Sequence, residues 1–184
     1  MVEVIKAPRR HPLRSGHAQA ASVSVGLAGD AVRVSLRART DAVAALSKAL
    51  GLPLPLRPKT SAVKGERSAL WIGPDEWLLI DAADGSLVAD IAKAKVLHSA
   101  VDVSHRNVGI VVSGKGADAV VNGGCPQDLS LKAFPVGAAS RTVLGKIEIV
   151  LWRAAEDVFR IECWRSFADY AHAFLQESAR DVAV

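Results

Sequence analysis

The chain has 184 residues, of which half are hydrophobic, and it carries a formal net charge of +4 at pH 7. This length fits one domain or two small lobes, and the apolar content suffices for a packed core. The mild positive charge is too small to indicate nucleic-acid binding, and no apolar run approaches the roughly 20 residues of a membrane helix. These properties predict a globular protein, and the lack of a signal-like apolar N-terminus indicates a cytoplasmic location.

The N-terminal stretch is predicted to be extended, because Pro8, Pro12 and Gly16 interrupt every periodic pattern there. Its basic residues and few apolar side chains suit a segment that becomes ordered against a partner. Three segments are predicted: an extended basic arm (1–20), a single α+β domain (21–178) and a C-terminal tail (179–184). The domain could consist of two lobes, which would then meet near 97–104.

The central stretch is residues 70–80, which hold two of the four tryptophans. The turn signal Gly73-Pro74 separates two apolar runs, which predicts a β-hairpin. Trp71 and Trp77 are expected to anchor a core from its two strands. The adjacent acids Asp75 and Glu76 are not expected to act as an acid/base pair, because neighbouring strand residues point to opposite faces.

This hairpin is the second of three predicted units, each made of two strands and a helix. In the first unit, residues 21–25 and 32–36 alternate apolar and polar residues around Gly29-Asp30, which predicts a hairpin with one solvated face. The third unit pairs residues 100–103 with 108–112 around a turn at 104–107. Three helices are predicted. The first is capped by Thr40 or Asp41 and closed by Gly51 and Pro53, and the others lie at 87–95 and at 117–121. The proline-rich connection 53–66 is expected to be irregular.

The C-terminal part is predicted to be a three-stranded meander followed by a helix. The strands are expected at 141–144, 147–152 and 158–163, and the helix at Ser166 with Asp169 as a capping-box partner. One helix face holds Phe167, Tyr170, Ala171, Phe174 and Leu175, which we expect to cover a sheet. The predicted fold class is α+β, with repeated strand-strand-helix units that form antiparallel sheets covered by helices.

Candidate catalytic and metal-binding residues are few. The only tight group of possible ligands is His98, Asp102 and His105. His98 and Asp102 share a strand face, but His105 lies in the following turn, so a site with all three ligands would require a distortion. Asp102 or Ser104 is therefore interpreted as capping a turn. No phosphate loop or dinucleotide fingerprint is present, so we predict no catalytic, cofactor-binding or metal-binding residue in this chain.

The two cysteines, Cys125 and Cys163, are too far apart in sequence to form a metal or redox motif. We interpret both as reduced, structural thiols. Cys163 is a weak candidate nucleophile, because the alternation of residues 158–163 places its thiol on the apolar face of a strand.

Five motifs in a fixed order resemble the gamma subunit family of heterotetrameric sarcosine oxidase. The resemblance spans about residues 40–176, and its motifs are 71–79 (WIGPDEWLL), 101–106 (VDVSHR), 124–129 (GCPQDL), 133–137 (AFPVG) with Arg141-Thr142, and 165–170 (RSFADY). It implies a non-catalytic subunit of a complex that oxidises sarcosine to glycine, with formation of formaldehyde or methylene-tetrahydrofolate and hydrogen peroxide. It also implies a fold similar to the folate-binding domain of the glycine-cleavage aminomethyltransferases.

The same resemblance implies partners and cofactors. The expected partners are the alpha, beta and delta subunits, and FAD, FMN, NAD, tetrahydrofolate and zinc are expected in those subunits rather than in this chain. Nucleic acid and membranes are not expected partners. The alternative is a stand-alone folate-binding or aminomethyltransferase-like protein, although the chain has about half the length of such enzymes. We expect residues 1–20 and 53–66 to contribute to the interface, because both are irregular.

Overall fold

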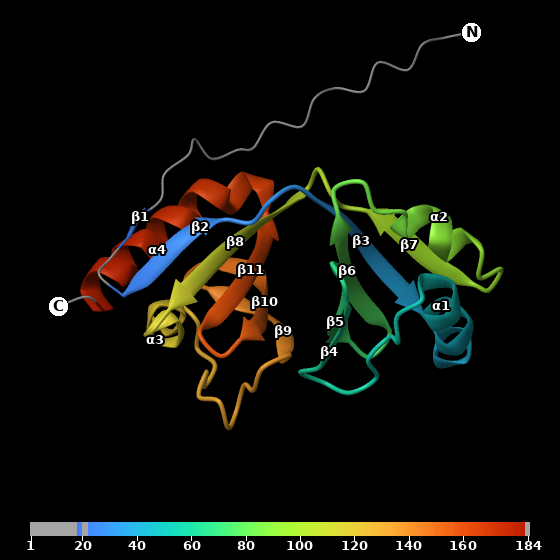
Figure 1. Cartoon of the computed structure of the whole chain (residues 1–184), viewed down its shortest axis with the longest axis horizontal. Helices are drawn as coiled ribbons and strands as arrows, with labels where there is room; N and C mark the ends of the chain where they lie inside the picture. The colour runs from blue at the N-terminus through green and yellow to red at the C-terminus, as the bar shows by residue number, and fades with distance from the viewer. Residues whose placement is uncertain (1–17, 20–21, 183–184) are drawn as a thin grey trace, which may run out of the picture.

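The structure is a computed structural model, and it describes residues 18–19 and 22–182. Two antiparallel sheets stand face to face, and each carries two helices on its outer side (Figure 1). The predicted fold class, α+β with antiparallel sheets covered by helices, is confirmed. Most of the predicted arm lies outside the described residues, although Ala18–Gln19 form the short strand β1.

The first sheet has six strands in the order β1-β2-β8-β11-β10-β9. Its core is a cluster of buried side chains between the sheet and helices α3 and α4. The meander predicted near the C-terminus is confirmed, because β10 pairs with both β9 and β11. The strands are β2 (Val23–Leu27), β8 (Asn107–Gly114), β9 (Ala139–Leu144), β10 (Ile147–Ala155) and β11 (Val158–Trp164), and the helices are α3 (Ala117–Asn122) and α4 (Ala168–Val182).

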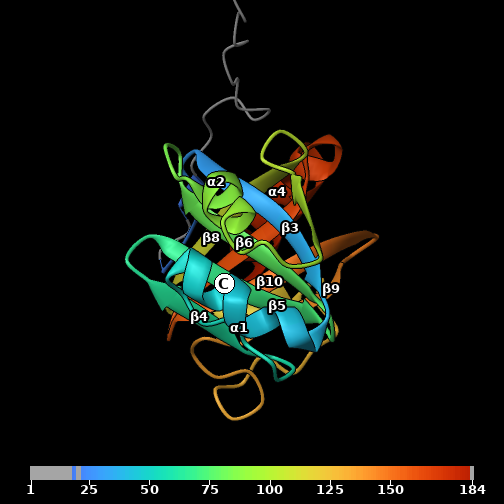
Figure 2. The ribbon, with the colours of Figure 1, turned by 90° about the vertical axis from the view of Figure 1, so that its right-hand side faces the viewer.

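The second sheet has five strands in the order β4-β5-β6-β3-β7. Helices α1 and α2 cover its outer face, as Figure 2 shows with both helices in front of the sheet. The central hairpin is confirmed as β5 and β6, in which Trp71 lies opposite Trp77. The elements are β3 (Ala31–Ala38), β4 (Ser61–Lys64), β5 (Arg67–Gly73), β6 (Glu76–Ala82), β7 (His98–Asp102), α1 (Val43–Leu50) and α2 (Leu87–Ala92).

Two of the three predicted hairpins are wrong. β2 pairs with β8 in the first sheet, whereas β3 pairs with β6 and β7 in the second. The connection between β7 and β8 also crosses from one sheet to the other (Figure 1). Alternation predicts which residues share a face, but it does not determine which strand becomes the neighbour. The two crossings join the halves of the molecule.

Smaller corrections concern the connection 53–66 and the last helix. The connection contains strand β4, and the indole Nε1 of Trp77 donates a hydrogen bond to the carbonyl of Pro55 at 2.7 Å. A 3-10 helix, Arg165–Phe167, precedes α4 without a side-chain cap, so the predicted capping box is wrong. The predicted buried face is partly wrong, because Phe167 is 38% exposed. The segment predicted as a tail from residue 179 is helical as far as Val182.

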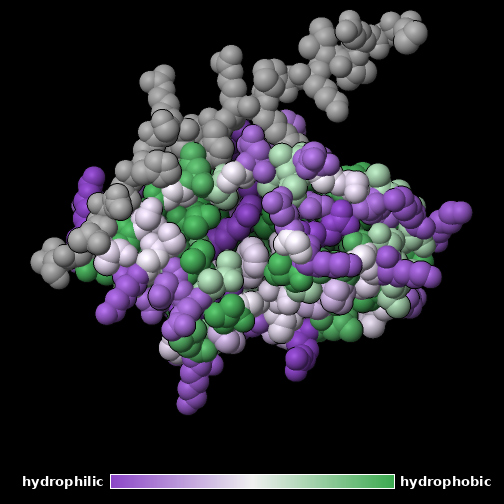
Figure 3. All heavy atoms as spheres, in the orientation of Figure 1, coloured by the Kyte–Doolittle hydropathy of each residue, from purple (hydrophilic) through white to green (hydrophobic). Residues whose placement is uncertain are grey.

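Helix α1 begins after the 3-10 helix Thr40–Ala42 and ends where the sequence predicts. Gly51 adopts a φ of 64°, and its N–H bonds to the carbonyl of Lys48. Glycine adopts this left-handed conformation without the steric penalty that a Cβ atom would cause, which explains why the helix ends here. On the face shown in Figure 3, hydrophilic and hydrophobic residues are interspersed over both halves of the molecule.

Candidate functional site

The candidate site is the cleft between the two sheets, because residues from distant parts of the chain meet there. Its apolar part is a third cluster of buried side chains, separate from the two helix-covered cores. β5 and β6 contribute Leu70, Ile72, Leu78 and Ile80, and the partly buried Val150 and Trp152 of β10 pack against them. Each of these strands therefore buries both faces, one under helices and one against the other sheet.

A buried ion pair joins the two sheets across this cleft. Arg33 of β3 and Glu162 of β11 lie 2.6 Å apart from Nε to Oε2, and their side chains are 5% and 1% exposed. Arg160 donates to the other carboxylate oxygen of Glu162 at 2.8 Å. Two guanidinium groups thus share one buried carboxylate, and loss of that carboxylate would leave Arg33 uncompensated.

Gly109 of β8 provides the space for this ion pair. A Cβ atom at position 109 would lie 2.8 Å from Oε1 of Glu162, 2.8 Å from the Cβ of Ala28 and 3.2 Å from Nη2 of Arg33. No real Cβ tolerates contacts under 3.0 Å without a shift of its neighbours. The glycine is therefore required because Ala28 and the side chain of Glu162, its cross-strand partner, pack directly against its backbone, and not because of an unusual φ.

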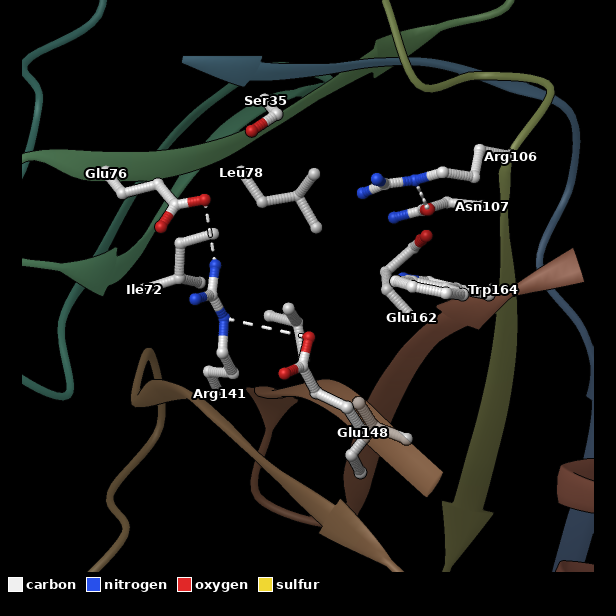
Figure 4. A pocket seen from close by; sticks show the side chains of 12 residues that line it. Ser35, Ile72, Glu76, Leu78, Arg106, Asn107, Arg141, Glu148, Glu162 and Trp164 are labelled. Carbon is white, nitrogen blue, oxygen red and sulfur yellow. Dashed lines mark hydrogen bonds and ion pairs between the residues drawn. The ribbon is translucent and has the colours of Figure 1, made fainter. Parts of the chain in front are cut away.

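Beside the ion pair lies a small polar pocket, drawn in Figure 4. Glu76 of β6 and Arg141 of β9 approach across it to 2.8 Å, and Arg141 also lies 3.9 Å from Glu148. The volume is about 40 Å³, whereas pockets for drug-sized ligands measure roughly 300–1,000 Å³. The pocket has room for a few water molecules, not for a folate.

The residues singled out from the sequence as possible ligands do not converge. Nδ1 of His98 lies 2.7 Å from the carbonyl of Val96, and His105 is exposed. Asp102 accepts a hydrogen bond from the N–H of Ser104 at 2.8 Å, so the interpretation of Asp102 as a turn cap is confirmed. Among residues 18–19 and 22–182, no group of three His, Cys, Asp or Glu residues could hold a metal ion.

Both cysteines are buried free thiols. Burial, with a smaller contribution from the adjacent Glu162, raises the pKa of Cys163 to about 12. A thiol with such a pKa is protonated at neutral pH and therefore a poor nucleophile.

The acids of the central hairpin lie in different environments. Asp75 forms an exposed ion pair with Arg37 at 2.9 Å, whereas Glu76 faces the cleft and Arg141. The roles of Arg33, Glu162 and Arg141 were not predicted from the sequence. For the first two the sequence carries only a partial signal, because each is a charged residue flanked by apolar residues within a strand. That pattern does not indicate which residue the charged side chain meets.

Comparison with known proteins decides the family. The sequence profile of the sarcosine oxidase, gamma subunit family matches residues 35–181. The sarcosine oxidase subunit gamma of Corynebacterium sp. (strain P-1) is 33% identical over 143 residues, which make up 76% of this chain and 70% of that protein. The chain belongs to the sarcosine oxidase gamma subunit family. The gamma subunit of an Arthrobacter species is 36% identical over 116 residues, which cover 61% of this chain and 57% of that subunit.

Solved structures extend this family relationship to the fold. A chain of the heterotetrameric sarcosine oxidase from Corynebacterium sp. U-96, in complex with pyrrole 2-carboxylate, superposes with a TM-score of 0.84 and 27% identity, covering 91% of this chain and 88% of that one. The glycine cleavage system aminomethyltransferase T of Bartonella henselae has a similar fold, with a TM-score of 0.66 and 16% identity. That match covers 88% of this gamma-family chain but half of the aminomethyltransferase. The resemblance predicted from the motif order is confirmed.

Proposed function

We propose that this chain is a non-catalytic, structural subunit of a heterotetrameric sarcosine oxidase. The observation that carries the proposal is the superposition on a chain of such a complex over nearly the whole length of both chains. The cleft agrees with it, because an apolar cluster and an internally neutralised ion pair occupy the space between the sheets. We assign no catalytic, cofactor-binding or metal-binding residue to the chain.

The proposed partners are the alpha, beta and delta subunits of the oxidase. The complex would oxidise the N-methyl group of sarcosine and reduce oxygen to hydrogen peroxide, with glycine and either formaldehyde or methylene-tetrahydrofolate as the other products. FAD, FMN, NAD, tetrahydrofolate and zinc are proposed to reside in the partner subunits. A cytoplasmic location is part of the same proposal. No helix in the described part of the chain is long and apolar enough to cross a membrane.

The proposed division keeps residues 21–178 as one α+β domain with two lobes and residues 1–20 as an arm that contacts a partner. The connection 53–66 is proposed to belong to the interface, and Leu56 within it is 59% exposed. Deleting the whole connection would also remove Leu54, which is 4% exposed, and strand β4. Point substitution is therefore the cleaner test of this segment.

The first experiment co-expresses the tagged chain with the other subunits of the oxidase from the same organism. We expect a co-purified complex with a flavin absorbance spectrum and sarcosine-dependent peroxide production. A chain beginning at residue 18 and the variant Leu56→Asp should each reduce recovery of the complex, while their far-ultraviolet circular dichroism stays unchanged. Val88→Asp on α2, at a residue that is 48% exposed, is the matched control. A purified wild-type chain that never associates with those subunits would contradict the proposal.

The alternative, a stand-alone folate-binding protein, is favoured by the fold shared with the aminomethyltransferase. The pocket of about 40 Å³ in the cleft is too small for tetrahydrofolate. Calorimetric titration of the isolated chain with tetrahydrofolate separates the two proposals. Saturable micromolar binding would favour the alternative, and we expect no heat of binding.

A further inference from the structure

A shelf of exposed aromatic rings lies where β11 ends. Trp164 is 44% exposed and Phe167 is 38% exposed, while the residues beside them in the chain, Cys163 and Ala168, are buried. The two rings stack at a centroid distance of 6.0 Å and an interplanar angle of 16°. We call Arg106, Trp164 and Phe167 the aromatic shelf.

The backbone holds this shelf in place. Trp164 pairs with Asn107 in the register between β11 and β8, and the N–H of Arg165 donates to the carbonyl of Arg106 at 2.6 Å. The guanidinium Cζ of Arg106 lies 5.3 Å from the centroid of the Trp164 ring. Ordering a large side chain on binding costs conformational entropy, so a shelf that is already ordered loses less.

Packing within the chain does not explain the shelf. Trp164 and Phe167 lie outside the three clusters of buried side chains found in residues 18–19 and 22–182. Tryptophan is highly buried on average, and ordered exposed aromatic residues beside arginine are typical of the energetically dominant residues of interfaces. The exposed area therefore indicates a surface that another molecule covers.

The chemistry of the shelf indicates what covers it. A hollow of about 550 Å³ is lined by Arg106, Trp164, Arg165 and Ser166. None of the ion pairs found between described residues involves Arg106. Nε of Arg106 donates to Oδ1 of Asn107 at 3.2 Å, which leaves the two terminal nitrogens of the guanidinium to meet a carboxylate in two-point geometry.

We propose that the aromatic shelf docks an acidic segment of another subunit of the oxidase, in which an Asp or Glu side chain meets Arg106 and an adjacent apolar side chain covers Trp164. The inference rests on the proposed function, because it names the surface through which the chain acts. It also places this contact on the crossing between β7 and β8, the segment that joins the two halves of the molecule.

The test is a competition for assembly. Wild-type and variant chains with different tags are co-expressed with the alpha, beta and delta subunits, and mass spectrometry gives their ratio in the purified complex. We expect Trp164→Ala and Arg106→Glu each to be incorporated at least ~10-fold less than wild type. Trp164→Phe, which keeps an aromatic ring, should recover part of the loss. Val88→Ala and Lys48→Glu, on the outer helices, are the matched controls and should compete equally.

The acidic character of the partner is tested separately. Dissociation of the complex should accelerate with added salt, and less so for Arg106→Gln. A photo-crosslinking benzoyl-phenylalanine at position 164 should capture a segment of another subunit that contains Asp or Glu. Capture of a second copy of this chain, or of a segment without acidic residues, would overturn the assignment.

The outcomes distinguish a failure of the docking proposal from a failure of the proposed function. Equal incorporation of Trp164→Ala and wild type, in a complex that forms, overturns the shelf alone. Failure of the wild-type chain to assemble overturns both. Thermal unfolding of the isolated variants checks that each one folds. If a variant unfolds at the same midpoint temperature as wild type, its reduced incorporation into the complex results from the altered surface and not from lower stability.

Discussion

At the scale of single residues, the most consequential group is the carboxylate of Glu162. It accepts hydrogen bonds from Arg33 at 2.6 Å and from Arg160 at 2.8 Å, and the Glu162 side chain is 1% exposed. Taking charges out of water is costly, so a buried pair contributes little net stability as long as it is complete. Removing one partner leaves the full desolvation cost of the other, which makes this residue sensitive to substitution.

We expect Glu162→Gln to lower the free energy of unfolding by about 3–5 kcal/mol, because the buried Arg33 would lose its counter-charge. Urea denaturation followed by circular dichroism measures the change. The double variant Arg33→Met with Glu162→Gln should regain part of the loss, since the unpaired buried cation is then absent. A single variant as stable as wild type would mean that water already solvates the pair.

At the scale of elements, a cluster of charged residues attaches helix α2 to the second sheet. The guanidinium of Arg67 on β5 lies 2.7 Å from Asp81 on β6 and 3.0 Å from Asp90 on α2, and it also donates to the carbonyl of Leu50 at 2.6 Å. One side chain thus holds α2 and the end of α1 on the sheet. Hydrogen bonds from Lys93, Ser86 and Arg67 hold the pKa of Asp90 well below its ordinary value.

This lowered pKa predicts a pH dependence of stability. The unfolded chain takes up a proton at Asp90 at a higher pH than the folded chain does, so the contribution of Asp90 is complete at neutral pH. It is lost as the pH falls from about 5 towards 2. Asp90→Asn should therefore be less stable than wild type at pH 7, and its stability should change less over that range. Denaturation midpoints at several pH values measure this, and parallel profiles would contradict it.

Strands β3 and β11 show what alternation of apolar and polar residues can and cannot predict. Alternation correctly separated Val32 and Val34 from Arg33 on β3, and Ile161 from Glu162 on β11. The polar face of β3 was nevertheless expected to be solvated, and it lies against the other sheet. A strand pattern records which residues share a face, but solvent and a second polar sheet face favour the same residue types. The ion pair in the cleft could not be predicted for that reason.

At the scale of the whole molecule, the two halves each have a helix-covered core of their own. They are coupled by the third cluster, by the buried ion pair and by the two chain crossings between the sheets. Two-state unfolding requires that this coupling be strong compared with the stability of each half. Ala28 and Glu162 pack closely against the backbone of Gly109. A single methyl group added at this position can therefore weaken the coupling between the two halves.

We expect Gly109→Ala to destabilise the protein by about 1–3 kcal/mol, because the added methyl group must displace Ala28 and the Glu162 carboxylate. The calorimetric transition should also broaden, since the halves then unfold less cooperatively. Gly29→Ala is the matched control, because its added Cβ would meet nothing within 4 Å. An unchanged transition for Gly109→Ala would show that the cleft relaxes around the methyl group.

The sequence by itself determined the α+β class, the central hairpin, the C-terminal meander and the family, since these follow from local alternation, turn residues and motif order. The tertiary structure alone decided that β2 and β3 belong to different sheets, that Arg33 meets Glu162, and that Trp164 with Phe167 stays exposed. The physical reason is that hydrophobic periodicity fixes the orientation of side chains within an element, whereas strand neighbours and facing layers depend on contacts between residues far apart in the chain. Arg33 and Glu162, 129 positions apart, are such a contact.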